Sequence, residues 1–178
     1  THRIHHSLLK KNVNSIMWVN KKISKEGNIN EPVSKMEKAL NSLKLRLINH
    51  SFVKMLKTGN KIIHSPSIIS SNWIKRINNS DTDIVHLHWI QNEMLSIRDI
   101  SKIKKPIVWT LHDMWAFCGA EHYTNDNRWR EGYKKNNRPS YESGFDLNLW
   151  TWKRKKKYWK TAFQIVTPSK WLSKCVSE

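Results

Sequence analysis

Polar side chains follow three apolar runs of the sequence and could carry chemistry there. A histidine in such a place can donate a hydrogen bond to an oxygen that develops charge, or hold a sugar hydroxyl. A serine and a lysine that open a helix stand beside free backbone N–H groups, which favour anions. The residues concerned are His88 and Trp89, His112 and Asp113, and Ser169 and Lys170.

The apolar runs that precede these residues predict β-strands over residues 83–89, 107–111 and 163–167. Helical apolar spacing covers residues 94–103 and 148–160. Strands that alternate with helices through short connections are typical of a parallel sheet with helices on both faces. The sequence therefore predicts an α/β fold.

In open parallel sheets, ligands bind outside the carboxyl ends of the strands. We therefore expect the three polar pairs to line one crevice, with His112 as the sharpest candidate. The alternative for His112 is a loop histidine bonded to a backbone carbonyl, and it stays open. His86 alternates with His88 along one strand and shares its face, so we expect at least one of them to be a hydrogen-bonded core histidine.

The rest of the chain is less regular. Residues 113–147 form a long polar stretch with little periodicity, which inside a compact domain is usually functional or disordered. Residues 50–70 are ambiguous, and no repeat or low-complexity linker divides the chain, so we expect one domain over residues 1–178. Further expected elements are helices over 2–11, from Ser34 with a capping box to Glu37, and from Asn72 to Ile77, a strand over 16–19 and a loop over 20–33.

A metal site is weighed at Cys118 and His122, because Cys and His are zinc ligands and His112 and Asp113 are near in sequence. The spacing His-x5-Cys-x3-His matches no zinc pattern, so we expect no metal and no cofactor. The chain has no GxGxxG, Walker or Gly-x-Ser-x-Gly motif. Its two cysteines lie far apart, which favours a reducing cytoplasm.

The chain is strongly basic, with 32 Lys and Arg against 14 Asp and Glu and a net charge of +18. Lysine is attracted to anionic lipid and tryptophan settles at the headgroup level, so one segment predicts docking to an anionic membrane surface. Nucleic acid, and a solvated helix whose aromatic residues pack inward, remain alternatives. The predicted docking residues are Trp152, Lys153, Arg154, Lys155, Lys156 and Lys157.

Three blocks of sequence carry a family resemblance. They resemble retaining glycosyltransferases of the family-4 type. The blocks are residues 83–90 (Asp-Ile-Val-His-Leu-His-Trp-Ile), residues 105–123, which include Trp-Thr-Leu-His-Asp, and residues 166–172 (Val-Thr-Pro-Ser-Lys-Trp-Leu). The most similar glycosyltransferases are those that build exopolysaccharide, capsule or O-antigen. The opening residues 3–9 are similar to the first helix of such proteins.

The resemblance implies a GT-B enzyme whose N-terminal, Rossmann-like half, residues 1–178, holds the acceptor. It implies a second domain, absent from this sequence, that binds a nucleotide-sugar, and transfer of a hexose with retained configuration to a lipid-linked or saccharide acceptor. The enzyme would be cytoplasmic and peripheral on the inner face of the membrane, and the fragment alone inactive.

The resemblance also implies roles for particular residues. His112 would lie against the transferring sugar, with Asp113 beside it as a second catalytic candidate, and Ser169 would lie near the interdomain side. The specific block 105–123 extends the predicted substrate-binding set, which comprises His88, Trp89, Glu121, His122, Tyr123, Ser169 and Lys170.

Two alternatives from other classes stay open. Net charge and ten tryptophans are typical of a nucleic-acid-binding module, although such a module leaves the strand that ends in His112-Asp113 unexplained. A non-catalytic α/β scaffold is the second alternative. We expect no nucleic-acid partner.

Overall fold

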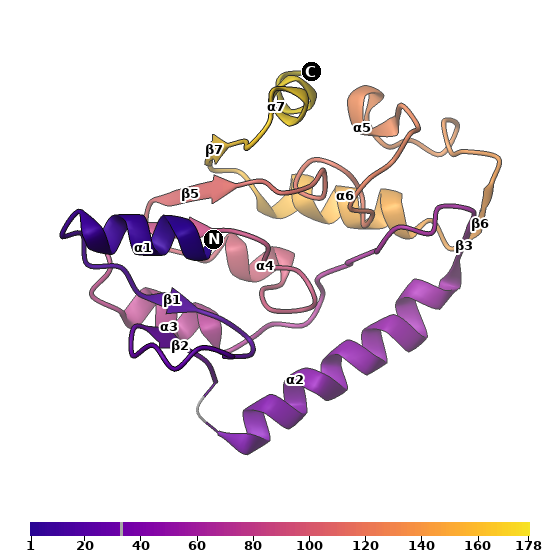
Figure 1. Cartoon of the computed structure of the whole chain (residues 1–178). Coiled ribbons are helices and arrows are strands. Elements are labelled where there is room, and N and C mark those ends of the chain that lie inside the picture. Colours follow the sequence, from indigo (N-terminus) through magenta and orange to yellow (C-terminus); the bar gives the residue numbers. More distant parts are fainter. Residues whose placement is uncertain (33) are drawn as a thin grey trace. The chain divides into compact units, whose positions relative to one another are not determined.

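The computed structural model describes residues 1–32 and 34–178 (Figure 1). The chain forms two compact units, Thr1–Leu43 and Lys44–Glu178. It is a mixed α/β protein with small parallel sheets, as the sequence predicted at this level. None of the helices in the described residues is long and apolar enough to cross a bilayer.

The first unit contains α1 (His2–Lys10) and a short parallel pair, β1 (Met17–Trp18) and β2 (Ile29–Asn30). The helix and the first strand were predicted. The second strand falls in the segment predicted as a loop, because a two-residue strand leaves no periodicity to detect.

Helix α2 (Lys35–Leu47) begins at a capping serine, as predicted: the Ser34 hydroxyl accepts a hydrogen bond from the backbone N–H of Glu37 at 3.0 Å. None of the residues of α2 is buried. Its large apolar side chains are instead exposed, namely Met36 (73%), Leu40 (48%), Leu43 (51%) and Leu47 (52%).

The second unit is built on a parallel sheet of β4 (Val85–Leu87), β5 (Ile107–Thr110) and β7 (Gln164–Val166), with β5 in the centre. Val85 pairs with Ile107, and Val108 pairs with Gln164. All three strands were predicted, each slightly longer than observed. The helices of this unit that the sequence also indicated are α3 (Trp73–Asn79), α6 (Leu147–Tyr158) and α7 (Lys170–Ser177).

Helix α4 (Ile97–Ile100) is much shorter than the predicted helix over 94–103. Ser96 caps it in a capping box with Asp99, and Glu93 just before it has a positive φ of 57°. The Glu93 carboxylate accepts hydrogen bonds from the backbone N–H groups of Ile68 and Ile69 at 2.8 and 2.9 Å. The segment before Ser96 is therefore fixed as a turn by a distant loop.

Aromatic residues form the centre of the second unit. Trp109 of β5 lies 5.5 Å from Trp159 and 5.6 Å from Phe163 between ring centroids, and Trp115 packs against the same group. The indole N–H of Trp159 donates to the carbonyl of Ile97 at 2.9 Å. Part of the tryptophan excess is therefore core, and the indole N–H groups of Trp115 and Trp159 are hydrogen-bonded there.

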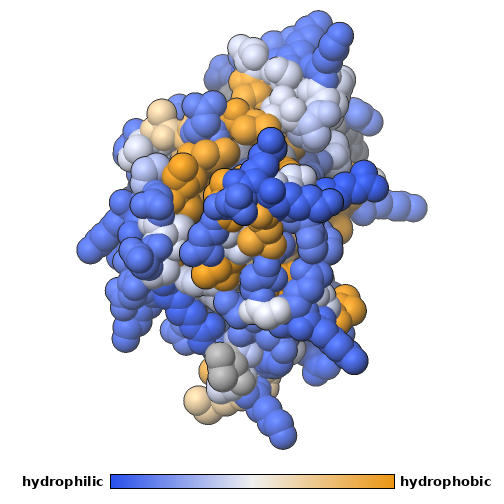
Figure 2. Space-filling view, turned by 60° about the vertical axis from the view of Figure 1, so that its left-hand side comes forward, coloured by the Kyte–Doolittle hydropathy of each residue, from blue (hydrophilic) through white to orange (hydrophobic). Residues whose placement is uncertain are grey.

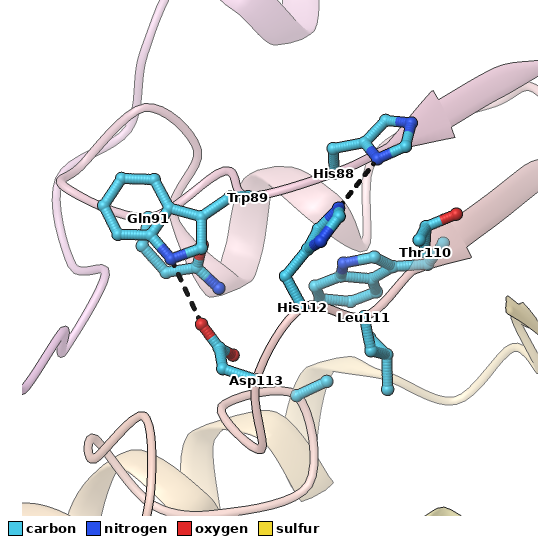
Figure 3. A pocket seen from close by; sticks show the side chains of 9 residues that line it. His88, Trp89, Gln91, Thr110, Leu111, His112 and Asp113 are labelled. Atoms are coloured by element: carbon cyan, nitrogen blue, oxygen red, sulfur yellow. Dashed lines mark hydrogen bonds between the residues drawn. The ribbon is translucent and has the colours of Figure 1, made fainter. Parts of the chain in front are cut away.

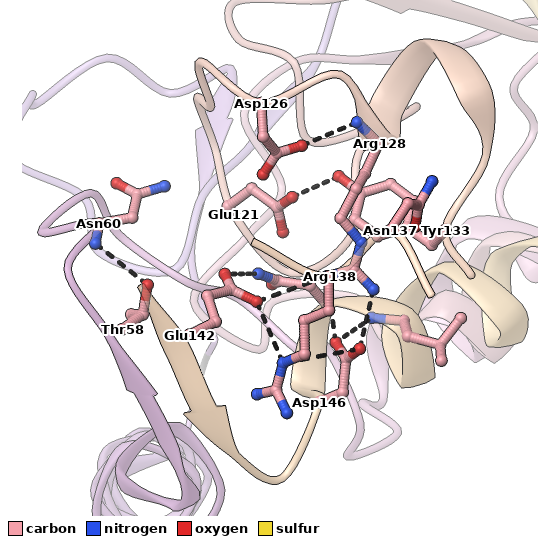
Figure 4. Close-up of polar contacts among 12 residues, drawn as sticks. Thr58, Asn60, Glu121, Asp126, Arg128, Tyr133, Asn137, Arg138, Glu142 and Asp146 are labelled. Atoms are coloured by element: carbon pink, nitrogen blue, oxygen red, sulfur yellow. Dashed lines mark hydrogen bonds and ion pairs between the residues drawn. The ribbon is translucent and has the colours of Figure 1, made fainter. Parts of the chain in front are cut away.

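The polar stretch 113–147 is ordered around buried charged side chains. Arg128 is 1% exposed and donates to Asp146 at 2.8 Å and Glu142 at 3.4 Å (Figure 4). Asn148 also donates to Glu142, at 2.8 Å. The remaining elements are π-helix Ile48–Phe52, 3-10 helix Val53–Met55, α5 (Arg128–Glu131), and the antiparallel pair β3 (Leu56–Thr58) and β6 (Glu142–Gly144).

Candidate functional site

Two histidines meet where neighbouring parallel strands end. His88 comes one residue after β4 and His112 two residues after β5, and the two strands pair directly. The Nδ1 atom of His88 lies 3.0 Å from Nε2 of His112 (Figure 3). The structure therefore brings together the two histidines that the strand-end rule selected.

A third histidine extends this row along β4. His86 lies 4.3 Å from His88 between ring centroids, and its Nε2 atom lies 2.8 Å from the hydroxyl of Thr110. His86 is exposed and His88 is half-buried. One of the two was expected to be a hydrogen-bonded core histidine; His86 is hydrogen-bonded, but neither side chain is fully buried.

Two histidines of this row, His86 and His88, favour uncharged rings. Burial, together with charge repulsion from its neighbours, lowers the pKa of His88 to about 4. Burial likewise lowers the pKa of His86. Near neutral pH, His88 thus offers one ring N–H donor and one acceptor and forms a hydrogen-bonded pair with His112.

Asp113 points into the protein and holds its neighbours in place. Its carboxylate accepts hydrogen bonds from the backbone N–H of Trp115 at 3.0 Å, the indole N–H of Trp89 at 3.1 Å, and Nδ1 of His122 at 2.7 Å. Asp113 is 6% exposed. The carboxylate of this predicted catalytic candidate therefore holds the side chains of Trp89 and His122.

A buried Ser-His-Asp chain continues from this carboxylate. Nε2 of His122 lies 2.8 Å from the hydroxyl of Ser65, and the indole N–H of Trp115 donates to the Ser65 carbonyl at 2.7 Å. Ser65 and His122 are each 4% exposed. A serine nucleophile must reach its substrate, so this chain joins the loop around Ser65 to the strand end and does not form a hydrolase site.

The pocket at the strand ends is small. Its free volume is about 10 Å³, room for about one water molecule, whereas sites for drug-sized ligands measure roughly 300–1,000 Å³. Asp113 is the one carboxylate among its lining residues. The pocket is lined by His88, Trp89, Gln91, Trp109, Thr110, Leu111, His112, Asp113 and Ala116 (Figure 3).

Exposed aromatic rings surround this edge. The Tyr123 hydroxyl donates to the carbonyl of His112 at 2.8 Å, and the Tyr123 ring stacks on Trp171 with centroids 6.2 Å apart. Tyr123 is 41% exposed, Trp171 55% and Trp89 43%. Tyr123 thus connects the end of β5 to the first turn of α7.

Ser169 and Lys170 open α7 at the same edge, because β7 runs parallel to β5 and ends beside it. The Ser169 hydroxyl accepts from the backbone N–H of Leu172 at 3.1 Å, so its side chain caps the helix. Lys170 is exposed. The first turn of α7, including Trp171, therefore faces the same edge as His112.

Two predicted substrate-binding residues, Glu121 and His122, are buried and hydrogen-bonded within the protein. Glu121 is 1% exposed and accepts a hydrogen bond from the Tyr133 hydroxyl, and burial raises the pKa of its carboxyl. Both ring nitrogens of His122 are used by Ser65 and Asp113. The chain turns inward here because Glu121 forms a β-bridge with His64.

Two of the predicted docking residues on α6, Arg154 and Lys155, are bound by carbonyls of the protein itself. Lys155 is 4% exposed and donates to the carbonyls of Trp115, Cys118 and Gly119, and burial lowers the pKa of its amine. Arg154 donates to the carbonyls of Pro66 and Ser67 at 2.6 and 3.0 Å. Five consecutive basic residues turn by about 100° each around a helix and cannot share one face.

The other residues of this segment have different surroundings. Trp152 is half-buried against Tyr133, with ring centroids 5.7 Å apart, and Lys156 lies 4.7 Å above the Trp152 ring. Lys153, Lys156 and Lys157 are exposed. Three exposed lysines remain, and one of them, Lys156, lies over the half-buried Trp152 ring.

Cys118 is unsuited to bind zinc, in agreement with the sequence, which did not favour a zinc site there. It is fully buried, and burial raises the pKa of its thiol, which disfavours the thiolate that binds metal. His122 has no ring nitrogen to spare.

Sequence reasoning missed Ser65 and Trp171 as parts of this region. Ser65 lies in the ambiguous segment 50–70 and is 57 residues from His122, so no local pattern could connect them. Trp171 was available to sequence reasoning, since it directly follows the predicted Ser169-Lys170 pair.

Comparison with known proteins adds nothing: no family model, no curated protein and no solved structure matches the chain.

Proposed function

We propose that this chain is the acceptor-side part of a retaining GT-B glycosyltransferase. The enzyme would move a hexose from a nucleotide-sugar to a lipid-linked or saccharide acceptor in the synthesis of bacterial surface polysaccharide. The observation that carries the proposal is the His88–His112 pair at the ends of adjacent parallel strands, with Asp113 turned inward and exposed aromatic rings around it.

The pair has the chemistry to hold a sugar. A neutral imidazole both donates and accepts a hydrogen bond, as does a sugar hydroxyl. His88 would fix the ring of His112, and a hydroxyl of the transferring hexose would bond to the exposed His112. Trp89, Tyr123 and Trp171 offer flat apolar faces on which the C–H face of a sugar ring can rest.

The pocket at the strand ends is too small to enclose a nucleotide-sugar. A sugar would therefore rest on the surface around it, and the nucleotide would bind on the donor domain that the family resemblance implies. The sole carboxylate of the pocket lining, Asp113, already accepts three hydrogen bonds. This supports a mechanism in which the leaving phosphate, and not a protein nucleophile, assists the transfer.

Docking to an anionic membrane also belongs to this proposal, and its best support lies on α2. At about 100° per residue, Met36, Leu40, Leu43 and Leu47 fall within an arc of roughly 60°. Lys35 and Arg46 flank that stripe on one side, and Lys44 flanks it on the other. An exposed apolar stripe with basic flanks is typical of a helix that lies in the plane of an anionic bilayer.

The proposal is tested with an enzyme that contains both halves. The purified protein is incubated with a panel of nucleotide-sugars and a lipid-linked acceptor, and the configuration of the product is read by NMR. We expect transfer from one donor class with the anomeric configuration retained. An inverted product, or donor hydrolysis and transfer both absent across the panel, would contradict the proposal.

A further inference from the structure

A cluster of potential metal ligands lies within the first compact unit, away from the strand ends. His2 and His6 are four residues apart on α1 and therefore share one face of the helix. Glu26 approaches this face from a turn. Within residues 1–32 and 34–178, these three form the one group of His, Cys, Asp or Glu ligand atoms that all lie within 4.8 Å of one another.

The three side chains converge closely. Nε2 of His2 lies 3.1 Å from Oε1 of Glu26, and Nε2 of His6 lies 3.1 Å from Oε2 of the same carboxylate. The two Nε2 atoms are themselves 3.1 Å apart. Tetrahedral Zn²⁺ with Zn–N and Zn–O bonds of about 2.0–2.1 Å places adjacent ligand atoms roughly 3.3 Å apart, so little movement is needed.

Protons alone cannot satisfy all three contacts. Each Nε2 atom carries at most one hydrogen, and a carboxylate only accepts. If both Nε2–H groups donate to Glu26, the two histidines face each other as two donors. If the Nε2–H of one histidine donates to Nε2 of the other, the accepting nitrogen carries no hydrogen, and its contact with the carboxylate is then not a hydrogen bond. A divalent cation at the centre satisfies both nitrogens and the carboxylate together.

The position of Glu26 is fixed by its own turn. Its backbone N–H donates to the hydroxyl of Ser24 at 3.0 Å, and the Lys22 ammonium donates to its carbonyl. The three ligand side chains retain 35–56% of their exposure, which leaves an entry path and room for a water ligand.

We propose that His2, His6 and Glu26 bind one Zn²⁺ ion, with water in the remaining position. Two imidazoles and a carboxylate suit zinc better than the hard cations Mg²⁺ and Ca²⁺, which take oxygen ligands. The ion joins α1 to the turn at Glu26 and stabilises the first unit. This departs from the sequence-based expectation of no metal, and it does not depend on the proposed transferase activity.

The test is titration of the metal-free chain with Zn²⁺ in competition with a chromophoric chelator. The variants are His6→Ala and Glu26→Gln. Glu31→Gln is the matched control, because Glu31 is a carboxylate of the same unit that is bound by Lys22 and Lys38 instead. We expect one zinc per chain, at least a tenfold loss of affinity in each variant, and wild-type affinity in the control.

Co²⁺ substitution supplies a second readout that folding alone would not change. We expect the intense d–d absorption of four-coordinate Co²⁺ in the wild type and in Glu31→Gln, and its loss in His6→Ala. Unchanged zinc affinity in His6→Ala and Glu26→Gln would overturn the site. Equal loss in Glu31→Gln would overturn it too, because the loss would then follow from disturbance of the unit.

Discussion

At the strand ends, some side chains face solvent, and buried side chains behind them fix their positions. His112, Trp89 and Tyr123 are exposed, whereas Asp113 and His122 are buried behind them. The carboxylate of Asp113 bonds to the indole N–H of Trp89, and the hydroxyl of Tyr123 bonds to the carbonyl of His112. These hydrogen bonds fix the exposed aromatic rings, and Tyr123 also stacks on Trp171.

Replacement of Asp113 by Asn tests this division. One carboxylate oxygen accepts from both Trp89 and His122, so an amide N–H₂ placed there would oppose two donors. We expect Asp113→Asn to lower the free energy of unfolding by about 1–3 kcal/mol. Asp81→Asn, at an exposed position, is the control in urea unfolding, and equal stability of the two variants would contradict the role of Asp113.

His88 gives a prediction about pH. Its pKa in the folded chain is about 4, below the ordinary value of 6.5, so the unfolded chain binds the extra proton between these values. The contribution of the uncharged His88 to the free energy of unfolding is therefore complete above pH 6.5 and is lost as the pH falls toward 4. Urea unfolding should show a steeper decline over this window for the wild type than for His88→Gln. Parallel profiles, or an NMR titration of His88 near pH 6.5, would show that its ring is not shielded.

At the scale of elements, local pattern predicted the strands β4, β5 and β7 and helices α1, α2 and α6, because each buries or presents a periodic set of apolar residues. It failed over 50–70 and 113–147, which are held by contacts between distant residues such as Ser65 with His122 and Arg128 with Asp146. It also could not separate Lys155 from the exposed lysines of α6. The carbonyls that bind Lys155 come from residues 115–119.

Lys155 and Lys153 make a matched pair on α6. Lys155→Met would leave the carbonyls of Trp115, Cys118 and Gly119 without their donor, so we expect it to lower the free energy of unfolding by about 2–5 kcal/mol. Lys153→Met, on the exposed side, should change it by about 0.5 kcal/mol or less. Thermal or urea unfolding measures both. A similar small effect of the two changes would mean that Lys155 is solvated.

Helix α2 provides a test of membrane docking. The double change Leu40→Ser and Leu43→Ser removes the centre of the exposed apolar stripe, so co-sedimentation with phosphatidylglycerol-containing liposomes should fall at least tenfold. The control changes Lys153→Gln and Lys157→Gln on α6 should reduce it much less. If the lysine changes abolish binding and the leucine changes do not, α6 is the docking element after all.

At the scale of the whole molecule, positive charge is the dominant feature. Hydrophilic side chains cover most of the face shown in Figure 2, with exposed apolar residues between them. A net charge of +18 attracts phosphate-bearing partners, including a nucleotide-sugar and an anionic bilayer, but does not select among them. In the proposed transferase, selection would therefore rest on the strand-end residues, and the small pocket there would need a second surface to complete the substrate site.

The most direct measurement is kcat for hexose transfer by the enzyme with both halves, comparing the wild type with His112→Ala. Because His112 would contact the transferring sugar, we expect kcat to fall on the order of a hundredfold. Arg98→Ala, an exposed residue of α4, should leave kcat unchanged. A wild-type kcat in His112→Ala, with the fold intact, would contradict the proposal that sugar transfer takes place at the His88–His112 pair.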